Sequence, residues 1–194
     1  MSLITFDDKV DSNLNPNPAI NKVVADDMNQ LKNGVNYFYD SQGFIIYSDT
    51  INTESVPQVL PEGIDTNITI VDPSPNRGQS PIELGSGNLW VGNKITPMAV
   101  GDAYIIRIDF KAKIDSANGY FDLKIDINGA IGDIFQKVFT FPKGRLLEEG
   151  FSTTSLIYTL DTFIANGGNI QIKPNAEMFI YDKAITIHRV YKGR

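Results

Sequence analysis

The chain has 194 residues, of which 42% are hydrophobic and 21% charged, and its 16 glycines and 10 prolines indicate a folded, turn-rich protein of one ordinary domain with appendages. It has no cysteine, which excludes disulfides, thiolate catalysis and zinc sites built on sulfur. Its formal net charge is -6, and its lysines and arginines are scattered, so we expect no nucleic-acid partner.

The N-terminal segment, residues 1–20, is predicted to be an extended arm. Pro16 and Pro18 force extended backbone on the residues before them, and the surrounding stretch is polar. The first residues lack the basic start and the apolar run of a secretory signal, and no later run is long enough to span a membrane. We therefore expect a protein made in the cytoplasm, without a signal peptide and without a membrane partner.

Residues 21–40 are predicted to form one short helix of the coiled-coil type. Asp26 and Asp27 mark its start, because carboxylates favour the positive end of the helix dipole. An alternating four–three spacing has the 3.5-residue period of a coiled-coil seam. The ladder covers only about two heptads, so the helix needs partners. The residues predicted to form a seam between copies of the chain are Val24, Met28, Leu31, Val35 and Phe38.

The alternative for this helix is an amphipathic helix packed on the chain's own β-sheets. Two observations favour self-association instead. The sequence predicts no second helix against which it could pack, and proline-rich connections separate it from the later strands.

Residues 41–100 are predicted to be a proline-rich connection with short strands at 44–47, 68–71 and 89–91. From residue 101 to residue 194 the hydrophobic pattern changes to period two, which is typical of half-buried strands. The expected strands cover 104–113, 121–127, 134–141, 153–160, 169–173, 178–181 and 184–191. The fold class is therefore mainly β, with a C-terminal antiparallel β-sandwich of the jelly-roll form whose first strands start near residue 85 or 101.

Few residues suggest chemistry. His188 is the only histidine, and it lies in a strand-like run, so a structural role is favoured over a catalytic or metal-binding one. Asp126, Asn128 and Asp133 hint at a calcium loop, but they lack the full ligand series, and a hairpin turn at Asn128 is favoured. We expect no metal, no cofactor and no enzymatic activity. Trp90 is a candidate ligand-contacting aromatic.

Three segments carry a resemblance to a known family. Residues 24–36 (VADDMNQLKNGVN) resemble a motif near the N-termini of fibre and decoration proteins of tailed bacteriophages. Residues 139–144 (FTFPKG) and 185–192 (ITIHRVYK) resemble the trimeric jelly-roll heads of phage fibres, which have a tumour-necrosis-factor-like fold. Head fibres of crAss-like and related phages are the most similar kind.

The resemblance implies a homotrimeric head fibre or decoration protein of the virion. Its arm would dock on capsid or connector proteins, and the jelly-roll head would adhere to the host surface, including a surface glycan. Residues of the arm that such docking would use are Phe6, Leu14, Pro16, Pro18 and Ile20. A tail-associated receptor-binding module with a carbohydrate pocket is the alternative. A polysaccharide-degrading enzyme is disfavoured, because convergent carboxylates are not evident.

Overall fold

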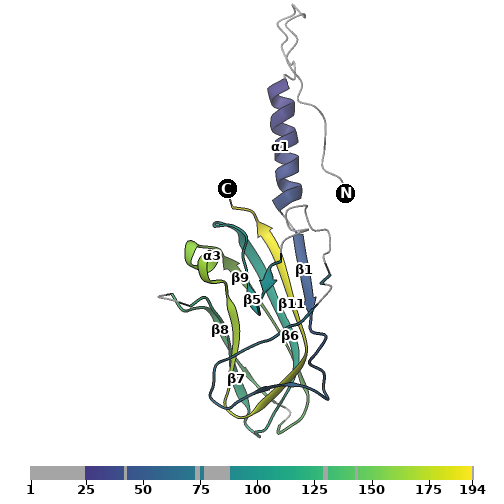
Figure 1. Ribbon diagram of the computed structural model, residues 1–194, viewed down its shortest axis with the longest axis vertical. Coiled ribbons are helices and arrows are strands. Elements are labelled where there is room, and N and C mark those ends of the chain that lie inside the picture. Colours follow the sequence, from purple (N-terminus) through teal and green to yellow (C-terminus); the bar gives the residue numbers. More distant parts are fainter. Residues whose placement is uncertain are drawn as a thin grey trace, which may run out of the picture.

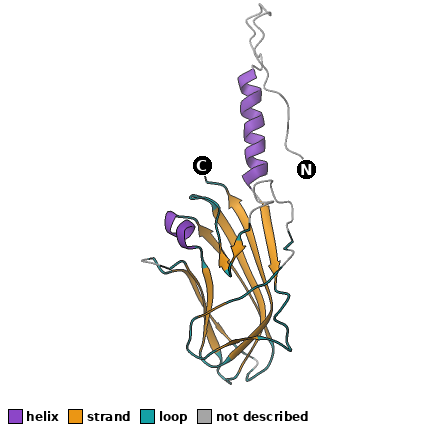
Figure 2. Ribbon diagram, viewed as in Figure 1, coloured by secondary structure: helices purple, strands orange, loops and turns teal. Residues whose placement is uncertain are grey.

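The computed structural model describes residues 25–41, 43–72, 75–76, 88–128, 131–142 and 144–193. In this part of the chain, a long helix stands at one end of a two-layer β-sandwich (Figure 1). The helix α1 spans Ala25–Ser41, as the sequence predicts. The other described residues form strands and loops, apart from one short helix, α3 (Asp161–Asn166) (Figure 2).

Two antiparallel sheets form the sandwich. The first has the strand order β1 (Gly43–Ser48), β11 (Met178–Tyr191), β6 (Ala103–Ile114) and β9 (Glu149–Tyr158), and β2 (Gln58–Leu60) also pairs with β11. The second has the order β3 (Thr66–Asn67), β10 (Asn169–Pro174), β7 (Tyr120–Asp126) and β8 (Asp133–Thr140). A separate hairpin joins β4 (Trp90–Val91) to β5 (Lys94–Ile95).

The strand pairs are nested along the chain. β7 pairs with β8, β6 with β9, β3 with β10 and β1 with β11, so each earlier strand meets a progressively later one. A long antiparallel hairpin rolled into two sheets has this pairing, which is that of a jelly roll. The predicted fold class is therefore confirmed. Residues 41–100, expected to be a connection with short strands, supply β1, β2 and β3 to the two sheets.

The core lies between the sheets, and in strands such as β6 and β7 it takes the alternate positions that the sequence pattern marks as apolar. At the end of the sandwich far from α1, five phenylalanines pack edge to face or stacked. Phe151 lies at the centre, with ring centroids 4.8 Å from Phe141, 4.9 Å from Phe121 and 5.5 Å from Phe110. Such ring contacts add to the area buried and close this end of the core.

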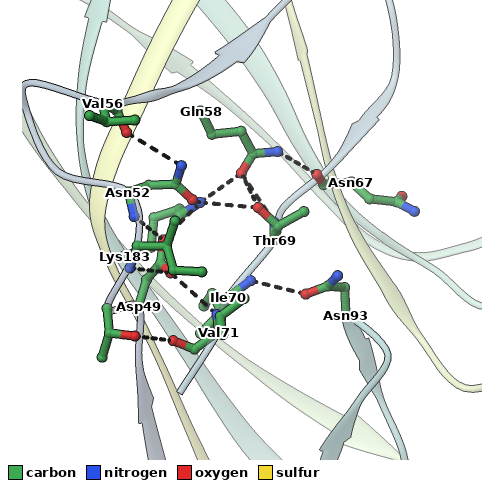
Figure 3. A network of polar contacts seen from close by, with 12 residues as sticks. Asp49, Asn52, Val56, Gln58, Asn67, Thr69, Ile70, Val71, Asn93 and Lys183 are labelled. Atoms are coloured by element: carbon green, nitrogen blue, oxygen red, sulfur yellow. Dashed lines mark hydrogen bonds and ion pairs between the residues drawn. The ribbon is translucent and has the colours of Figure 1, made fainter. Parts of the chain in front are cut away.

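The predicted strand at residues 68–71 is wrong, although Ile68 and Ile70 are buried as expected. Regular pairing stops at Asn67 because side chains take the backbone N–H groups that a ladder would use. The N–H of Thr69 donates to Gln58 Oε1 at 3.1 Å, that of Ile70 to Asn93 Oδ1 at 3.1 Å, and that of Val71 to Asp49 Oδ1 at 3.2 Å (Figure 3). These three N–H groups are thus satisfied without a partner strand.

The two strands predicted at 178–181 and 184–191 form the single strand β11. The polar pair Asp182–Lys183 suggested a break, but the strand continues through an irregularity in register between Tyr181 and Ala184. Asp182 takes a φ of 48°, and the inserted residue lets Lys183 point inward, where it is 2% exposed. A β-bulge re-aims side chains in this way.

Lys183 organises a buried polar network between β11, β2 and the loop after β1 (Figure 3). Its Nζ lies 3.1 Å from Asp49 Oδ2, and it donates to Asn52 Oδ1 at 2.8 Å and to Gln58 Oε1 at 2.7 Å. Burial lowers the pKa of Lys183, and the Asp49 carboxylate opposes that shift. Because its donors are satisfied, we interpret this lysine as a structural cross-connection rather than a reactive group.

Three further differences from the predicted elements are local. The strand expected at 153–160 is β9, which spans Glu149–Tyr158. The short helix α3 follows it and was not predicted from the sequence. The strand expected at 89–91 is β4, and its partner β5 was missed because it has only two residues. Short elements of this kind carry too little periodicity to be recognised.

Candidate functional site

Two of the predicted seam residues of α1, Leu31 and Val35, are exposed to solvent. Leu31 is 61% exposed and Val35 is 40% exposed, and Met28 is partly buried. Val24 lies outside the described residues, and so does the side chain of Phe38. Figure 1 shows α1 projecting away from the sandwich, which it joins at the start of β1. The part of α1 whose side chains are described therefore presents its apolar ladder outward.

The outer face of the first sheet carries an apolar row near the helix. The row crosses all four strands in register, one residue from each: Phe44, His188, Ile105 and Leu156. Their neighbours along each strand point into the core, so these side chains point outward. The rings of Phe44 and His188 pack edge to face, with 6.2 Å between their centroids. This packing agrees with a structural role for the histidine.

The edge strand β9 gives the row its most exposed member. Leu156 is 70% exposed, and it is followed on the same side of the strand by Tyr158 and then by Leu160, both more than half exposed. Each row side chain on the inner strands is only partly exposed. An edge strand with exposed apolar side chains is a surface on which another chain readily docks.

The outer face changes from apolar to charged with distance from α1. In the next row Arg107 replaces an apolar residue, and its Nε donates to Asp109 Oδ1 at 3.0 Å. Farther along, Lys111 Nζ lies 3.2 Å from Asp182 and 3.8 Å from Glu148. Exposed ion pairs of this kind keep a surface solvated. The apolar row beside the helix thus gives way to ion pairs along β6 farther from the helix.

A cavity of about 490 Å³ lies beside the β4–β5 hairpin, and Trp90 lines it. The indole is 7% exposed, and its Nε1 donates to the carbonyl of Ile70 at 3.3 Å. Tyr47, also in the wall, accepts a hydrogen bond from the N–H of Leu89 at 2.9 Å. The structure thus places Trp90 at the edge of a cavity, mostly within the core. The local sequence did not indicate the other lining residues, which come from β1, from residues 70–72 and 75, and from residues 88–93 around the hairpin.

The tyrosines with displaced pKa values are held in structural contacts. Burial raises the pKa of Tyr104, and the hydrogen bond that its hydroxyl donates to Asp102 at 2.6 Å adds to the shift. Burial likewise raises the pKa of Tyr181, whose hydroxyl donates to Glu148 at 2.5 Å. Both stay protonated at neutral pH, so neither is poised as a base.

Other kinds of site receive no support from the described residues. No cluster of three or more histidine, aspartate or glutamate side chains there is placed to hold a metal ion. The described helices include none with the length and apolarity needed to cross a bilayer. The predicted docking residues Phe6, Leu14, Pro16, Pro18 and Ile20 lie outside the described residues.

Comparisons with known proteins show similarity in architecture. No protein-family model matches the sequence, and no curated protein matches it. Similar solved structures include the Eiger TNF of S. frugiperda, with 8% identity over 78% of this chain and 95% of that chain and a TM-score of 0.48. They also include vertex protein P5 of PRD1, with 12% identity over 78% and 73% and a TM-score of 0.42. The jelly-roll assignment itself follows from the strand pairing of this chain.

Proposed function

We propose that this chain is a non-enzymatic virion structural protein, a homotrimeric head fibre or decoration protein of a tailed bacteriophage. Its N-terminal arm anchors it to capsid or connector proteins, and its jelly-roll head is presented for adhesion to the host surface. The observation that carries the proposal is the apolar surface at one end of the molecule, where the ladder of α1 and the row from Phe44 to Leu156 both face solvent.

The ladder of α1 and the row on the sheet are close along the chain, which supports their use in one interface. The helix ends at Ser41, and Phe44, the first member of the row, follows three residues later. Copies that align their helices therefore bring the helix-proximal halves of their sheets together. The ladder alone is too short to hold a trimer, since isolated helices of this length are marginal. The sheet row has to supply most of the contact, and the helix keeps the chains in register.

The charge pattern supports the same arrangement. An interface core is depleted of charged residues, and its rim is polar. The uncharged interface core would be the row of Phe44, His188, Ile105 and Leu156. The polar rim would include Arg107 of the following row, which pairs with Asp109. The resemblance of residues 24–36 to phage fibre motifs favours three copies and a location in the virion after synthesis in the host cytoplasm.

Leu31→Asp is expected to reduce the mass of the full chain in solution below that of three copies. The substitution puts one carboxylate per chain into the apolar seam, where charge is costly to desolvate. Light scattering measures the mass. Gln30→Asp is the matched control, because Gln30 is exposed one position away from the ladder. An unchanged mass for Leu31→Asp, or an equal loss in both variants, would count against the seam.

Removal of residues 1–20 is expected to leave oligomers that no longer join virus particles. The arm lies before α1, so its loss spares the helix and both sheets. Incorporation is measured by particle purification and immunoblotting, with the full chain as reference and light scattering to show that oligomers persist. Normal incorporation of the shortened chain would refute attachment through the arm.

A tail-associated receptor-binding module with a carbohydrate pocket is the second candidate, and the cavity at Trp90 is the observation that favours it. Labelling the protein in images of the whole particle separates the two, because a fibre of the head and a module of the tail occupy different positions. Binding studies need the full chain, since β1 and β3 belong to the two sheets.

A further inference from the structure

The cavity beside Trp90 has a rigid polar rim. The β4–β5 hairpin turns at Gly92 and Asn93, with φ values of 58° and 62°. Two successive positive φ values are those of the tight hairpin turn that matches the twist of its strands. Asn93 is therefore held in a fixed backbone conformation, and its side chain lies in the cavity wall.

The side-chain amide of Asn93 is oriented by the protein. Its Oδ1 accepts the N–H of Ile70 at 3.1 Å, as Figure 3 shows. The Nδ2 group forms no hydrogen bond to any residue that the structure describes. An amide with its oxygen engaged presents two N–H donors in a fixed direction. A ligand in the cavity with hydroxyl or carbonyl oxygens would accept from them.

The remaining lining is a mixture of aromatic, amide and carboxylate groups. Trp90 and Tyr47 contribute aromatic side chains to the lining, and Asn88 and Asp72 contribute polar groups. No lysine, arginine or histidine is among the described residues of the lining. The described lining thus offers no cation to attract a phosphate, a sulfate or an acidic sugar, and the Asp72 carboxylate repels them. The volume of about 490 Å³ falls in the range of small-ligand sites.

We propose that this cavity binds one uncharged sugar unit, with donors from Asn93 and an apolar wall from Trp90. A neutral sugar offers hydroxyl acceptors for a fixed amide and apolar C–H faces for an aromatic ring. The inference rests on the proposed role in host-surface adhesion and names the chemistry of the ligand. Weak binding at each cavity suffices there, because three linked copies bind jointly.

Trp90 makes occupancy directly measurable, since it is the single tryptophan of the chain. The full chain is titrated with glucose, galactose, mannose and N-acetylglucosamine, and separately with glucuronate and glucose 6-phosphate, while tryptophan emission is recorded. An array of immobilised neutral glycans tests sugars in longer chains. We expect a saturable change in emission with at least one neutral sugar and none with the charged ones.

Asn93→Gly is expected to weaken that response about tenfold, the factor that corresponds to a loss of about 1.4 kcal/mol. Glycine keeps the positive φ without strain. Asn128→Gly is the matched control, because Asn128 also has a positive φ of 58° and does not line the cavity. Silence with every neutral sugar and glycan, a response to charged sugars only, or equal weakening in both variants would overturn the proposal. Trimer mass and particle incorporation test the proposed function independently.

Discussion

Replacing Lys183 by methionine is expected to lower the free energy of unfolding by about 3–5 kcal/mol, the cost of leaving one member of a buried ion pair without its partner. The Lys183 and Asp49 side chains are 1% and 0% exposed. Without the ammonium group, the Asp49 carboxylate keeps only backbone donors, and the side-chain oxygen of Asn52 loses its donor. The side-chain oxygen of Gln58 keeps only its two donors from Thr69. Denaturant unfolding at matched protein concentration measures the loss.

Lys111→Met is the control for this change. Lys111 also pairs with carboxylates, at 3.2 Å and 3.8 Å, but its side chain is 47% exposed, so its loss is expected to cost no more than about 1 kcal/mol. Adding Asp49→Asn to Lys183→Met removes the unpaired charge and is expected to recover part of the stability. Equal losses for the two single variants would show that Lys183 does not hold the loops together.

Much of the sandwich was predictable because its pattern is local. In β6 and β7 every second residue is apolar, and the buried positions follow that alternation without exception. The order of the strands in each sheet could not be predicted from this local pattern. Pairs such as Phe44 with His188 join residues from opposite ends of the chain. The fold class follows from strand number and spacing, and the register depends on the packed whole.

The polar network could not have been predicted from the sequence. Lys183 and Asn52 are separated by 131 positions, and an isolated Asp182–Lys183 pair more often marks the end of a strand. The same network removes the predicted strand at 68–71, because Asp49 and Gln58 satisfy its N–H groups. Local propensity fails at these positions since distant side chains replace the ladder.

The ladder of α1 could be predicted from the sequence more fully than the row on the sheet or the cavity at Trp90. The ladder in α1 follows from spacing alone, and the structure leaves Leu31 and Val35 exposed. The row on the sheet could be recognised only from the strand register, because two strands lie between Phe44 and Leu156. Trp90 was expected to contact a ligand, and it lies at the wall of a cavity whose polar rim comes from Asn93, which the sequence did not indicate.

Leu156→Asp is expected to convert the proposed trimer into single chains. Burying a leucine side chain is worth about 1.5–3 kcal/mol, and the threefold arrangement loses that contribution three times while it gains three carboxylates to desolvate. The effect should exceed that of Leu31→Asp, because the row on the sheet is the larger contact and Leu156 is its most exposed member. Light scattering across a dilution series measures the mass.

Ser152→Asp is the matched control, because Ser152 points outward from the same strand, beyond the apolar row and opposite Asp109. Both substitutions put the same residue on an exposed position of β9, so both should leave the far-ultraviolet circular dichroism of the chain unchanged. The mass of Ser152→Asp should remain that of three chains. If Leu156→Asp also stayed trimeric, the sheet row would not be the interface.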